Sequence, residues 1–349
     1  MPPQTMKAIK IVSRGKAEIQ DVPVPRLRDD YVLVKVKCVA LNPTDWKHRD
    51  SEALSTPGCT LGCDYAGVVE EVGSKVTKEW KKGAGFCHGG NAVEPEDGVF
   101  GEYCVAKGDV QLRIPDNTSF EEACTLGVGV ITCGQALYQS LELPLPGSGK
   151  SAGYPLLIYG ASTATGSLAL QYALHSGCSP IIAVCSPRNF PFVKALGATE
   201  AFDYNDPKCG EKIRAYTNNT LTKALDCIAE GASPAICCAA ISSQGGEISY
   251  LLKVKHDRED VVNKWTLGYT VVGEAFKFGP AEMPAKPEDF EFTKGFVDVS
   301  TRLLASSQIS VHPAQVGKGG LQGVLEGLEL LKAGKVSGVK LVYKVDETT

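Results

Sequence analysis

The chain has 349 residues, of which 43% are hydrophobic and 22% charged, and its formal net charge is −4. This length and composition are typical of a globular protein with about two domains. The acidic balance gives no electrostatic basis for binding nucleic acid or an anionic membrane, and no apolar run reaches the ~20 residues that span a bilayer.

Thirteen cysteines are scattered through apolar segments without the spacing of a disulfide framework. Residues 1–10 lack the apolar stretch of a secretion signal. In a chain of this length, such cysteines are typical of reduced thiols that pack as small hydrophobic side chains. We therefore expect a cytoplasmic protein.

Glycines divide the N-terminal third into short strand-like segments. Strands are predicted at residues 7–12, 18–22, 31–41, 68–72 and 98–105, with a turn at 81–85. Pro43 ends the third of these strands, and Thr44 or Asp45 can cap a short helix that carries Trp46 and Lys47. Many short strands in close succession predict an all-β, barrel-like module.

From Pro115 the pattern changes to alternating helices and strands. Ser119 and Glu122 form a capping box for a helix from about residue 120, and a second helix is predicted at 130–141. Strands are then predicted at 155–159, 181–185, 201–204, 223–228 and 246–251, with helices at 166–176, 190–196, 209–217 and 234–241. This alternation predicts a parallel sheet covered on both faces by helices.

The turn at residues 160–166 is the most informative part of that alternation. An apolar strand ends on Gly160, and a helix begins near Gly166. Such a turn exposes unpaired N–H groups at a helix N-terminus, which can bind phosphate. An ordinary strand–helix turn has the same pattern, so this segment alone leaves both interpretations open.

The C-terminal part departs from the alternation. A strand is predicted at 265–272, helices at 287–305 and 318–332, and a last strand at 338–345. Gly334 ends the second of these helices. We expect these elements to return to the first module.

Four motifs in this order resemble the medium-chain dehydrogenase/reductase superfamily. They are Asn42–Asp45, Gly62–Gly67, Gly98–Tyr103 and Gly160–Gly166. The resemblance implies an α/β fold in which a Rossmann doubly wound parallel sheet is inserted in a GroES-like β-barrel substrate domain. It places the GroES-like domain at residues 1–117 and 266–349, and the Rossmann domain at 118–265.

Further motifs are similar to a narrower group, the fungal stand-alone enoyl reductases that act in trans on iterative polyketide synthases. They are Leu143–Pro146, Ser162–Thr165, Cys185–Phe190, Phe202–Tyr204, Ala224–Ile228, Trp265–Gly268 and Gly273–Glu274. Thr163 and Ala164 stand where the superfamily commonly has glycine, and the same substitution occurs in this group. Hydroxyls of Ser162, Thr163 and Thr165 could supplement the backbone donors to phosphate.

The sequence lacks the zinc ligands of the superfamily's zinc-dependent members. Those members carry Gly-His-Glu where this chain has Gly62-Cys63-Asp64, and no cysteine lies between Cys87 and Cys104. Cys59, Cys63 and His88 could form a site, but packing in the core is the stronger interpretation. We expect no metal.

The end of the second Rossmann strand indicates the cofactor. An NAD site usually has an acidic residue there, about 20 residues after the glycine turn. This chain has Cys185-Ser186-Pro187-Arg188-Asn189 instead. A hydroxyl and a guanidinium suit a 2′-phosphate, so we expect NADPH; the alternative is an ordinary surface arginine.

The resemblance implies three further sets of site residues. Besides Cys185, Ser186, Pro187 and Arg188, the resemblance assigns to the cofactor Thr44, Asp45, Trp46, Lys47, Gly160, Ser162, Thr163, Ala164, Thr165, Tyr204, Leu251, Val339 and Lys340. It assigns to the substrate Thr132, Cys133, Gly134, Thr270, Val271, Val272, Gly273 and Glu274. Lys47 would polarise the substrate carbonyl as the catalytic residue, although it could equally be a solvated lysine. Water or Tyr65 could supply the proton.

The resulting hypothesis is an NADPH-dependent enoyl reductase that acts on a polyketide thioester bound to the carrier domain of an iterative polyketide synthase. The alternative on the same fold is a zinc-independent quinone or alkenal reductase. An alternative of another class is a non-catalytic NADPH-binding scaffold protein. The resemblance favours a monomer over a homodimer.

Overall fold

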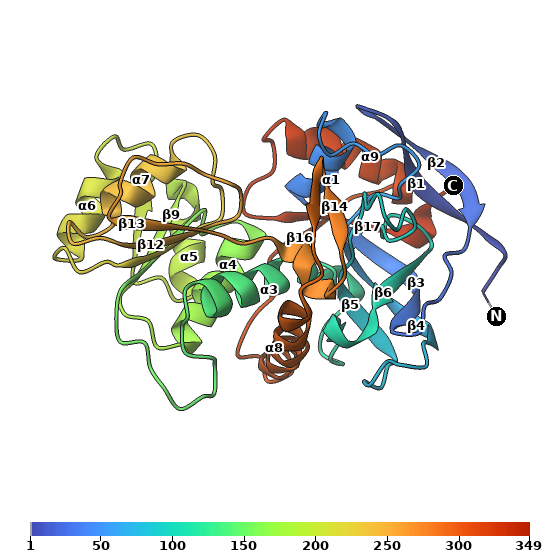
Figure 1. The fold of residues 1–349 in the computed structure, drawn as a ribbon, viewed down its shortest axis with the longest axis horizontal. Helices are drawn as coiled ribbons and strands as arrows, with labels where there is room; N and C mark the ends of the chain where they lie inside the picture. Colours follow the sequence, from blue (N-terminus) through green and yellow to red (C-terminus); the bar gives the residue numbers. More distant parts are fainter. Residues whose placement is uncertain (1) are drawn as a thin grey trace. The chain divides into compact units, whose positions relative to one another are not determined.

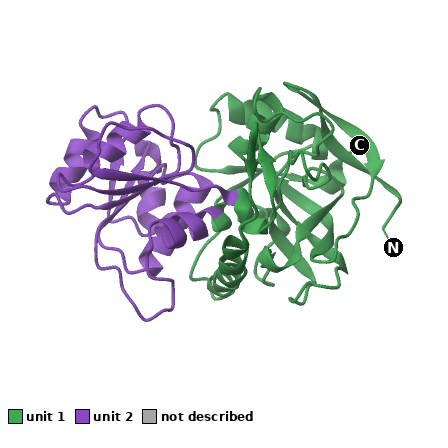
Figure 2. Cartoon of the chain, viewed as in Figure 1, with its two compact units in different colours: residues 1–131, 269–349 green, residues 132–268 purple. Residues whose placement is uncertain are grey.

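The computed structural model describes residues 2–349 (Figure 1). The chain forms two compact units (Figure 2), which we call unit 1 (residues 1–131 and 269–349) and unit 2 (residues 132–268). The C-terminal segment thus returns to the first module. The domain boundaries after residues 117 and 265 stay a prediction. No helix among residues 2–349 has the length and apolar character to cross a membrane.

Unit 1 is built on a curved, largely antiparallel sheet. Its strands run in the order β16-β17-β3-β4-β5-β7, and β6 pairs with β3. Their bounds are β3 (Tyr31–Ala40), β4 (Asp64–Val72), β5 (Lys82–Phe86), β6 (Tyr103–Lys107), β7 (Leu112–Arg113), β16 (Ala314–Val316) and β17 (Lys340–Lys344). Two hairpins, β1 (Thr5–Ser13) with β2 (Lys16–Pro23) and β14 (Phe276–Phe278) with β15 (Ala281–Met283), complete the strands of this unit.

Strand β3 is the centre of this sheet. Val34, Val36 and Cys38 are buried and Lys35 is exposed, because successive side chains of a strand point to opposite faces of the sheet. One edge of β3 pairs with β4, while the other pairs with β6 over residues 31–35 and with β17 over residues 38–40. The prediction of a turn at 81–85 was wrong, because that segment is β5 and pairs with both β4 and β7.

Unit 1 has two long helices, α8 (Pro287–Ala305) and α9 (Gly320–Lys332). Its other helices are short: α1 (Pro43–Asp50), α2 (Phe120–Ala123) and most of α3 (Gly127–Cys133). Ser119 and Glu122 form the predicted capping box of α2. The predicted cap of α1 was right in part. Asn42, not Thr44, is the N-cap residue, and Asp45 completes a capping box by accepting the Asn42 backbone N–H at 2.6 Å.

Unit 2 is a doubly wound parallel sheet. Its strands run in the order β10-β9-β8-β11-β12-β13, and every pair is parallel. Their bounds are β8 (Leu156–Tyr159), β9 (Ile181–Cys185), β10 (Glu200–Asp203), β11 (Lys223–Asp226), β12 (Gly246–Tyr250) and β13 (Val261–Trp265). The predicted strand at 265–272 was wrong, because the chain is in β13 up to Trp265 and then forms the 3₁₀ segment Gly268–Val272.

Right-handed crossovers place the helices of unit 2 on both faces of its sheet. The helices are α4 (Ala164–His175), α5 (Phe190–Ala195), α6 (Cys209–Tyr216) and α7 (Ser233–Ala240). Because the strand order reverses after β8, α4 and α5 cover one face and α6 and α7 the other, where Figure 1 shows them adjacent. The predicted helix at 130–141 is instead the end of α3 followed by a π-helix at Gly134–Ser140.

A buried ion pair connects the strands and helices of unit 1. Asp64 at the start of β4 is fully buried and pairs with Lys340, which is 4% exposed. The Asp64 carboxylate also accepts the Val128 N–H at 2.6 Å and the Asn42 side-chain amide at 2.9 Å. Lys340 donates in addition to the Asn42 amide oxygen at 3.0 Å and the Thr125 carbonyl at 3.4 Å.

Breaking the Asp64–Lys340 ion pair should destabilise unit 1. Lys340→Met leaves a buried carboxylate without its cation, and we expect it to lower the free energy of unfolding of unit 1 by about 3–5 kcal/mol. Urea unfolding in a Trp265→Phe background measures this, because Trp46 and Trp80 then report on unit 1 alone. The Asp64→Asn/Lys340→Met double variant should lose less than Lys340→Met. A double variant that loses as much would contradict the pairing.

The close approach of β3 and β4 can be tested at Gly67. A Cβ there would lie 2.3 Å from the Lys35 carbonyl oxygen, whereas a Cβ at Gly295 in α8 would meet nothing within 4 Å. Gly67→Ala should therefore lower the free energy of unfolding by about 1–3 kcal/mol. Gly295→Ala, the matched control, should raise it by up to ~1 kcal/mol. Equal effects of the two variants on the urea midpoint would refute this account.

Candidate active site and cofactor site

The turn after β8 has the geometry of a phosphate-binding turn. Gly160 has φ +73°, and a Cβ at Gly166 would lie 2.2 Å from the Gly160 carbonyl oxygen, so the helix can start this close only with glycine there. Thr163 is the N-cap of α4, and its hydroxyl accepts the Gly166 N–H at 3.0 Å. The helix N-terminus is therefore held against the end of β8.

The hydroxyls of this turn divide into two groups. Thr163 donates its hydroxyl proton to the Gly160 carbonyl at 2.8 Å, so this hydroxyl stabilises the turn, contrary to the expectation that it supplements the phosphate donors. Ser162 and Thr165 are partly exposed, and Ser162 accepts the Asn189 amide at 3.0 Å. The first-turn N–H groups of Ala164 and Thr165 have no intrahelical acceptor, which is the arrangement that binds an anion.

The strand order places this turn where dinucleotides bind in such sheets. The order reverses between β8 and β11, and ligands of open α/β sheets bind outside the carboxyl ends of the strands at that point. Leu251 directly follows β12 at the same edge. Cys133 at the end of α3 donates to the Thr165 carbonyl at 3.4 Å, so the predicted substrate residues 132–134 connect to the turn within unit 2.

Three residues assigned to the cofactor, Ser186, Arg188 and Tyr204, follow the ends of β9 and β10. The hydroxyls of Ser186 and Tyr204 lie 3.1 Å apart. Arg188 lies in the 3₁₀ turn Pro187–Asn189, is exposed, and forms no ion pair among residues 2–349. A guanidinium and two hydroxyls at one edge can hold a dianionic phosphate.

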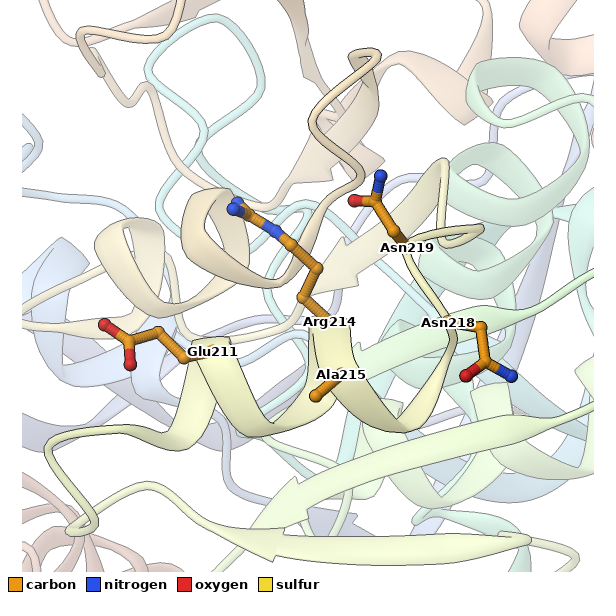
Figure 3. Close-up of a pocket in the computed structure, with 5 residues that line it drawn as sticks. All are labelled: Glu211, Arg214, Ala215, Asn218 and Asn219. Carbon is orange, nitrogen blue, oxygen red and sulfur yellow. The ribbon is translucent and has the colours of Figure 1, made fainter.

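A surface pocket of unit 2 lies elsewhere. Figure 3 shows it at the end of α6, lined by Glu211, Arg214, Ala215, Asn218 and Asn219. Arg214 donates to the Ile241 carbonyl at 2.9 Å, and Asn219 to the Ser243 hydroxyl at 2.8 Å. Because the chain runs from this turn into β11, the pocket is at the amino edge of the sheet, opposite the phosphate turn. It is not the dinucleotide site.

Helix α1 of unit 1 carries the predicted residues 44–47 in different environments. Asp45 is 1% exposed, and burial raises the pKa of its carboxyl to about 7. Asp45 therefore lies in the core, where its carboxylate caps α1 through the Asn42 backbone N–H. Thr44, Trp46 and Lys47 are partly exposed, and the Lys47 ammonium lies 5.7 Å from the centre of the Trp46 ring.

Thr44 belongs to a cluster with Tyr269 and His48, which the sequence analysis missed, and with His88, which it considered only as a metal ligand. The Thr44 and Tyr269 hydroxyls lie 2.6 Å apart, and Tyr269 OH is 3.0 Å from His48 Nε2. His88 stacks on the Tyr269 ring with centroids 4.1 Å apart. A usable signal was present, since Thr44 and His48 are four residues apart and share a helix face. Tyr65, considered as a proton donor, is fully buried and donates to Gln111 at 3.3 Å.

The predicted substrate segment at 270–274 is tied into unit 1. Thr270 is hydrogen-bonded to Asp289 of α8, and Val271 is fully buried. Glu274 accepts the Tyr31 hydroxyl at 2.9 Å and pairs with Lys107 at 2.7 Å. Among the substrate residues in unit 2, Thr132 and Cys133 are buried and Gly134 starts the π-helix. A role in substrate binding stays a prediction for both segments.

The structure does not support the predicted role of Lys340. The resemblance assigned this lysine and the partly buried Val339 to the cofactor, but the Lys340 ammonium is fully engaged by Asp64, Asn42 and Thr125. It acts instead as a structural cation of unit 1.

Within residues 2–349, no group of three or more His, Cys, Asp or Glu side chains is arranged to hold a metal ion. Cys59 donates to the Asn91 carbonyl at 3.2 Å and Cys87 to the Val105 carbonyl at 3.4 Å. Burial raises the pKa of the Cys63 thiol well above its usual value. These residues do not fit zinc, which binds thiolates.

Two protein-family models match the chain. The alcohol dehydrogenase GroES-like domain matches residues 28–116, and the zinc-binding dehydrogenase domain matches residues 164–251. The quinone oxidoreductase of Coxiella burnetii has the same fold, with a TM-score of 0.72 at 23% identity over 98% of this chain and 99% of its own. The fold is therefore a GroES-like domain with a Rossmann domain, as predicted.

Curated relatives match at much higher identity. The trans-enoyl reductase ACTTS2 of Alternaria alternata is 47% identical over 98% of this chain and 99% of its own length. The trans-enoyl reductase resD of Aspergillus sclerotiorum is 45% identical over 97% of this chain and 100% of its own length. An oxidoreductase of this fold uses a nicotinamide cofactor. From the identity to these two relatives, the chain belongs to the trans-enoyl reductases of the medium-chain dehydrogenase/reductase superfamily.

Proposed function

We propose that the protein is an NADPH-dependent trans-acting enoyl reductase that reduces the α,β-double bond of a polyketide thioester in fungal secondary metabolism. The observation that carries the proposal is the identity of 47% and 45% to two trans-enoyl reductases over nearly the whole chain. The substrate would be bound to the carrier domain of an iterative polyketide synthase, which would be the partner protein.

The preference for NADPH rests on the carboxyl ends of β9 and β10. Ser186, Arg188 and Tyr204 would hold the 2′-phosphate, and no acidic side chain at the end of β9 would repel it. The first-turn N–H groups of α4, with Ser162 and Thr165, would hold the pyrophosphate. The cofactor contacts of residues 44–47, Leu251 and Val339 stay predictions from the resemblance.

The chemistry needs no metal ion. NADPH supplies a hydride to the β carbon when bound, and the thioester delocalises the resulting charge onto its carbonyl oxygen. The Lys47 ammonium is proposed to stabilise that oxygen, since a fixed positive charge is worth most where negative charge develops. Its position on a short, capped helix beside Trp46 limits its freedom.

The proposal includes a monomer in the cytoplasm. All thirteen cysteines are free thiols, which agrees with a reducing compartment. Size-exclusion chromatography with light scattering would measure the oligomeric state directly.

An enoyl thioester distinguishes the proposed function from its alternatives. We expect NADPH oxidation at 340 nm with crotonyl-CoA, because this thioester carries the activated double bond that the site is proposed to reduce. Turnover of 1,4-benzoquinone with no turnover of crotonyl-CoA or of a carrier-bound enoyl thioester would favour a quinone reductase. Binding of NADPH with no turnover of any of these would favour a scaffold protein.

Arg188 should determine the choice between NADPH and NADH. Loss of one charge-assisted hydrogen bond to phosphate costs about 1.5–3 kcal/mol, so Arg188→Ala should weaken NADPH binding roughly 10- to 100-fold. NADH binding should not change. Lys194→Ala removes another positive charge from the same unit, one that pairs with Glu200, and is the control expected to leave both affinities unchanged. Fluorescence titration measures both constants, and equal weakening of NADPH and NADH by Arg188→Ala would contradict the assignment.

A further inference from the structure

A chain of three hydrogen-bonding groups runs inward from α1. Thr44 Oγ1 lies 2.6 Å from Tyr269 OH, which lies 3.0 Å from His48 Nε2. Each group can both donate and accept: a threonine hydroxyl, a phenol hydroxyl and an imidazole. Thr44 is partly exposed, whereas Tyr269 is 6% and His48 3% exposed, so the chain has one accessible end and one buried end.

The surroundings hold this chain in place and keep it neutral. The Tyr269 ring is stacked on His88, and Phe276 and Phe278 lie within 6.0 Å and 5.6 Å of its centre. Burial lowers the pKa of His48 to about 4 and raises the pKa of Tyr269. At neutral pH all three groups therefore keep a proton that can move to a neighbour without leaving a buried charge.

The inner end of the chain has polar atoms without a protein partner. His48 Nδ1 and both ring nitrogens of His88 are buried and have no hydrogen-bond partner among residues 2–349. Native interiors pair nearly all such atoms, with protein or with water. Gly90 is in direct proximity to His48 Nδ1, since a Cβ at residue 90 would lie 2.5 Å from that nitrogen. A water molecule that paired these nitrogens could exchange a proton with His48 Nδ1.

We propose that Thr44, Tyr269 and His48 form a proton relay that delivers a solvent proton to the α carbon of the reduced substrate. This inference rests on the proposed enoyl reductase function and supplies the proton donor that the sequence does not reveal. Thr44 is the catalytic residue of the relay, and Tyr269 and His48 act through it.

The proton transfers balance without any further reactant. After hydride has been added to the β carbon, the electron pair of the former double bond is shared between the α carbon and the carbonyl oxygen. The Thr44 O–H bond breaks as the α C–H bond forms, Tyr269 passes its proton to Thr44, and His48 Nε2 passes its proton to Tyr269. A proton from water binds His48 Nδ1, so His48 changes tautomer and no charge remains in the core.

A relay of fixed geometry differs from bulk water in the stereochemistry of protonation at the α carbon. Thr44 lies on one helix and is held from one side by Tyr269, so the proton would reach a single face of the α carbon. Reduction in D₂O should then give a product with deuterium at one α configuration. Random protonation by solvent would give both configurations.

Tyr269→Phe tests the relay, because it keeps the ring stacked on His88 and removes only the hydroxyl. General acid–base catalysis contributes about 10²–10⁴-fold, so kcat for crotonyl-CoA should fall at least ~100-fold. We expect the NADPH dissociation constant to be unchanged and the α-deuterium configuration, read by NMR, to become mixed. Tyr343→Phe removes the hydroxyl of another buried tyrosine in unit 1 and should change neither quantity.

A second pair of variants keeps the test decisive if Tyr269→Phe does not fold. Thr44→Val should lose turnover and stereochemistry, and Thr44→Ser, which retains the hydroxyl, should recover both. The ¹⁵N resonances of His48 give a readout independent of activity, since its Nε2 signal should shift in Tyr269→Phe.

The outcomes separate the relay from the function on which it rests. A wild-type protein that reduces no enoyl thioester overturns the enoyl reductase function and the relay together. A wild-type protein that does so, with Tyr269→Phe and Thr44→Val equal to it in kcat and in α configuration, overturns the relay alone.

Discussion

The carboxylate of Asp64 is bound from several directions at once, and the architecture of unit 1 depends on it. Lys340 brings β17 to β4, Asn42 fixes the start of α1, and the Val128 N–H anchors the N-terminus of α3. Gly127 makes the last contact possible, since a Cβ there would lie 2.4 Å from the carboxylate. Segments up to 276 residues apart in sequence therefore converge on one buried charge. A buried ion pair is not by itself evidence of high stability, but one with every oxygen engaged favours a single arrangement of these segments.

That arrangement places the groups on which the proposed chemistry depends. Asn42 caps α1, so the same network that binds Asp64 sets the direction of Thr44 and His48 toward Tyr269. In unit 2 a single side chain has a similar structural role. The Thr163 hydroxyl donates to the Gly160 carbonyl and accepts the Gly166 N–H, and so closes the turn between these residues. Thr163 and Lys340, which resemble ligand contacts in sequence, thus use their side chains within the scaffold. Tyr269 and His48, which no motif marked, form a hydrogen-bonded chain with Thr44.

The sequence predicted local structure well and long-range contacts poorly. The strand at 181–185 and the helix at 287–305 agree with the structure at both ends, because apolar runs and a proline at the start of a helix are local signals. Residues 81–85 were predicted as a turn, yet residues 82–86 form β5, and β4 and β7 pair with it on either side. A strand was predicted at residues 265–272, but hydrogen bonds of Tyr269 to α1 and of Thr270 to α8 hold residues 268–272 in a 3₁₀ turn. The partner of Lys340 is 276 residues away, and no periodicity reports such a pairing.

The fate of the transferred hydride is the most direct test of the account. A carrier-protein-bound enoyl thioester would be incubated with the protein and with NADPH that carries deuterium at its transferable C4 position, and the acyl chain would be analysed by mass spectrometry and NMR. The proposed function predicts a saturated acyl chain with one deuterium at the β carbon. An unreduced thioester, or a saturated chain without deuterium at that carbon, would contradict it.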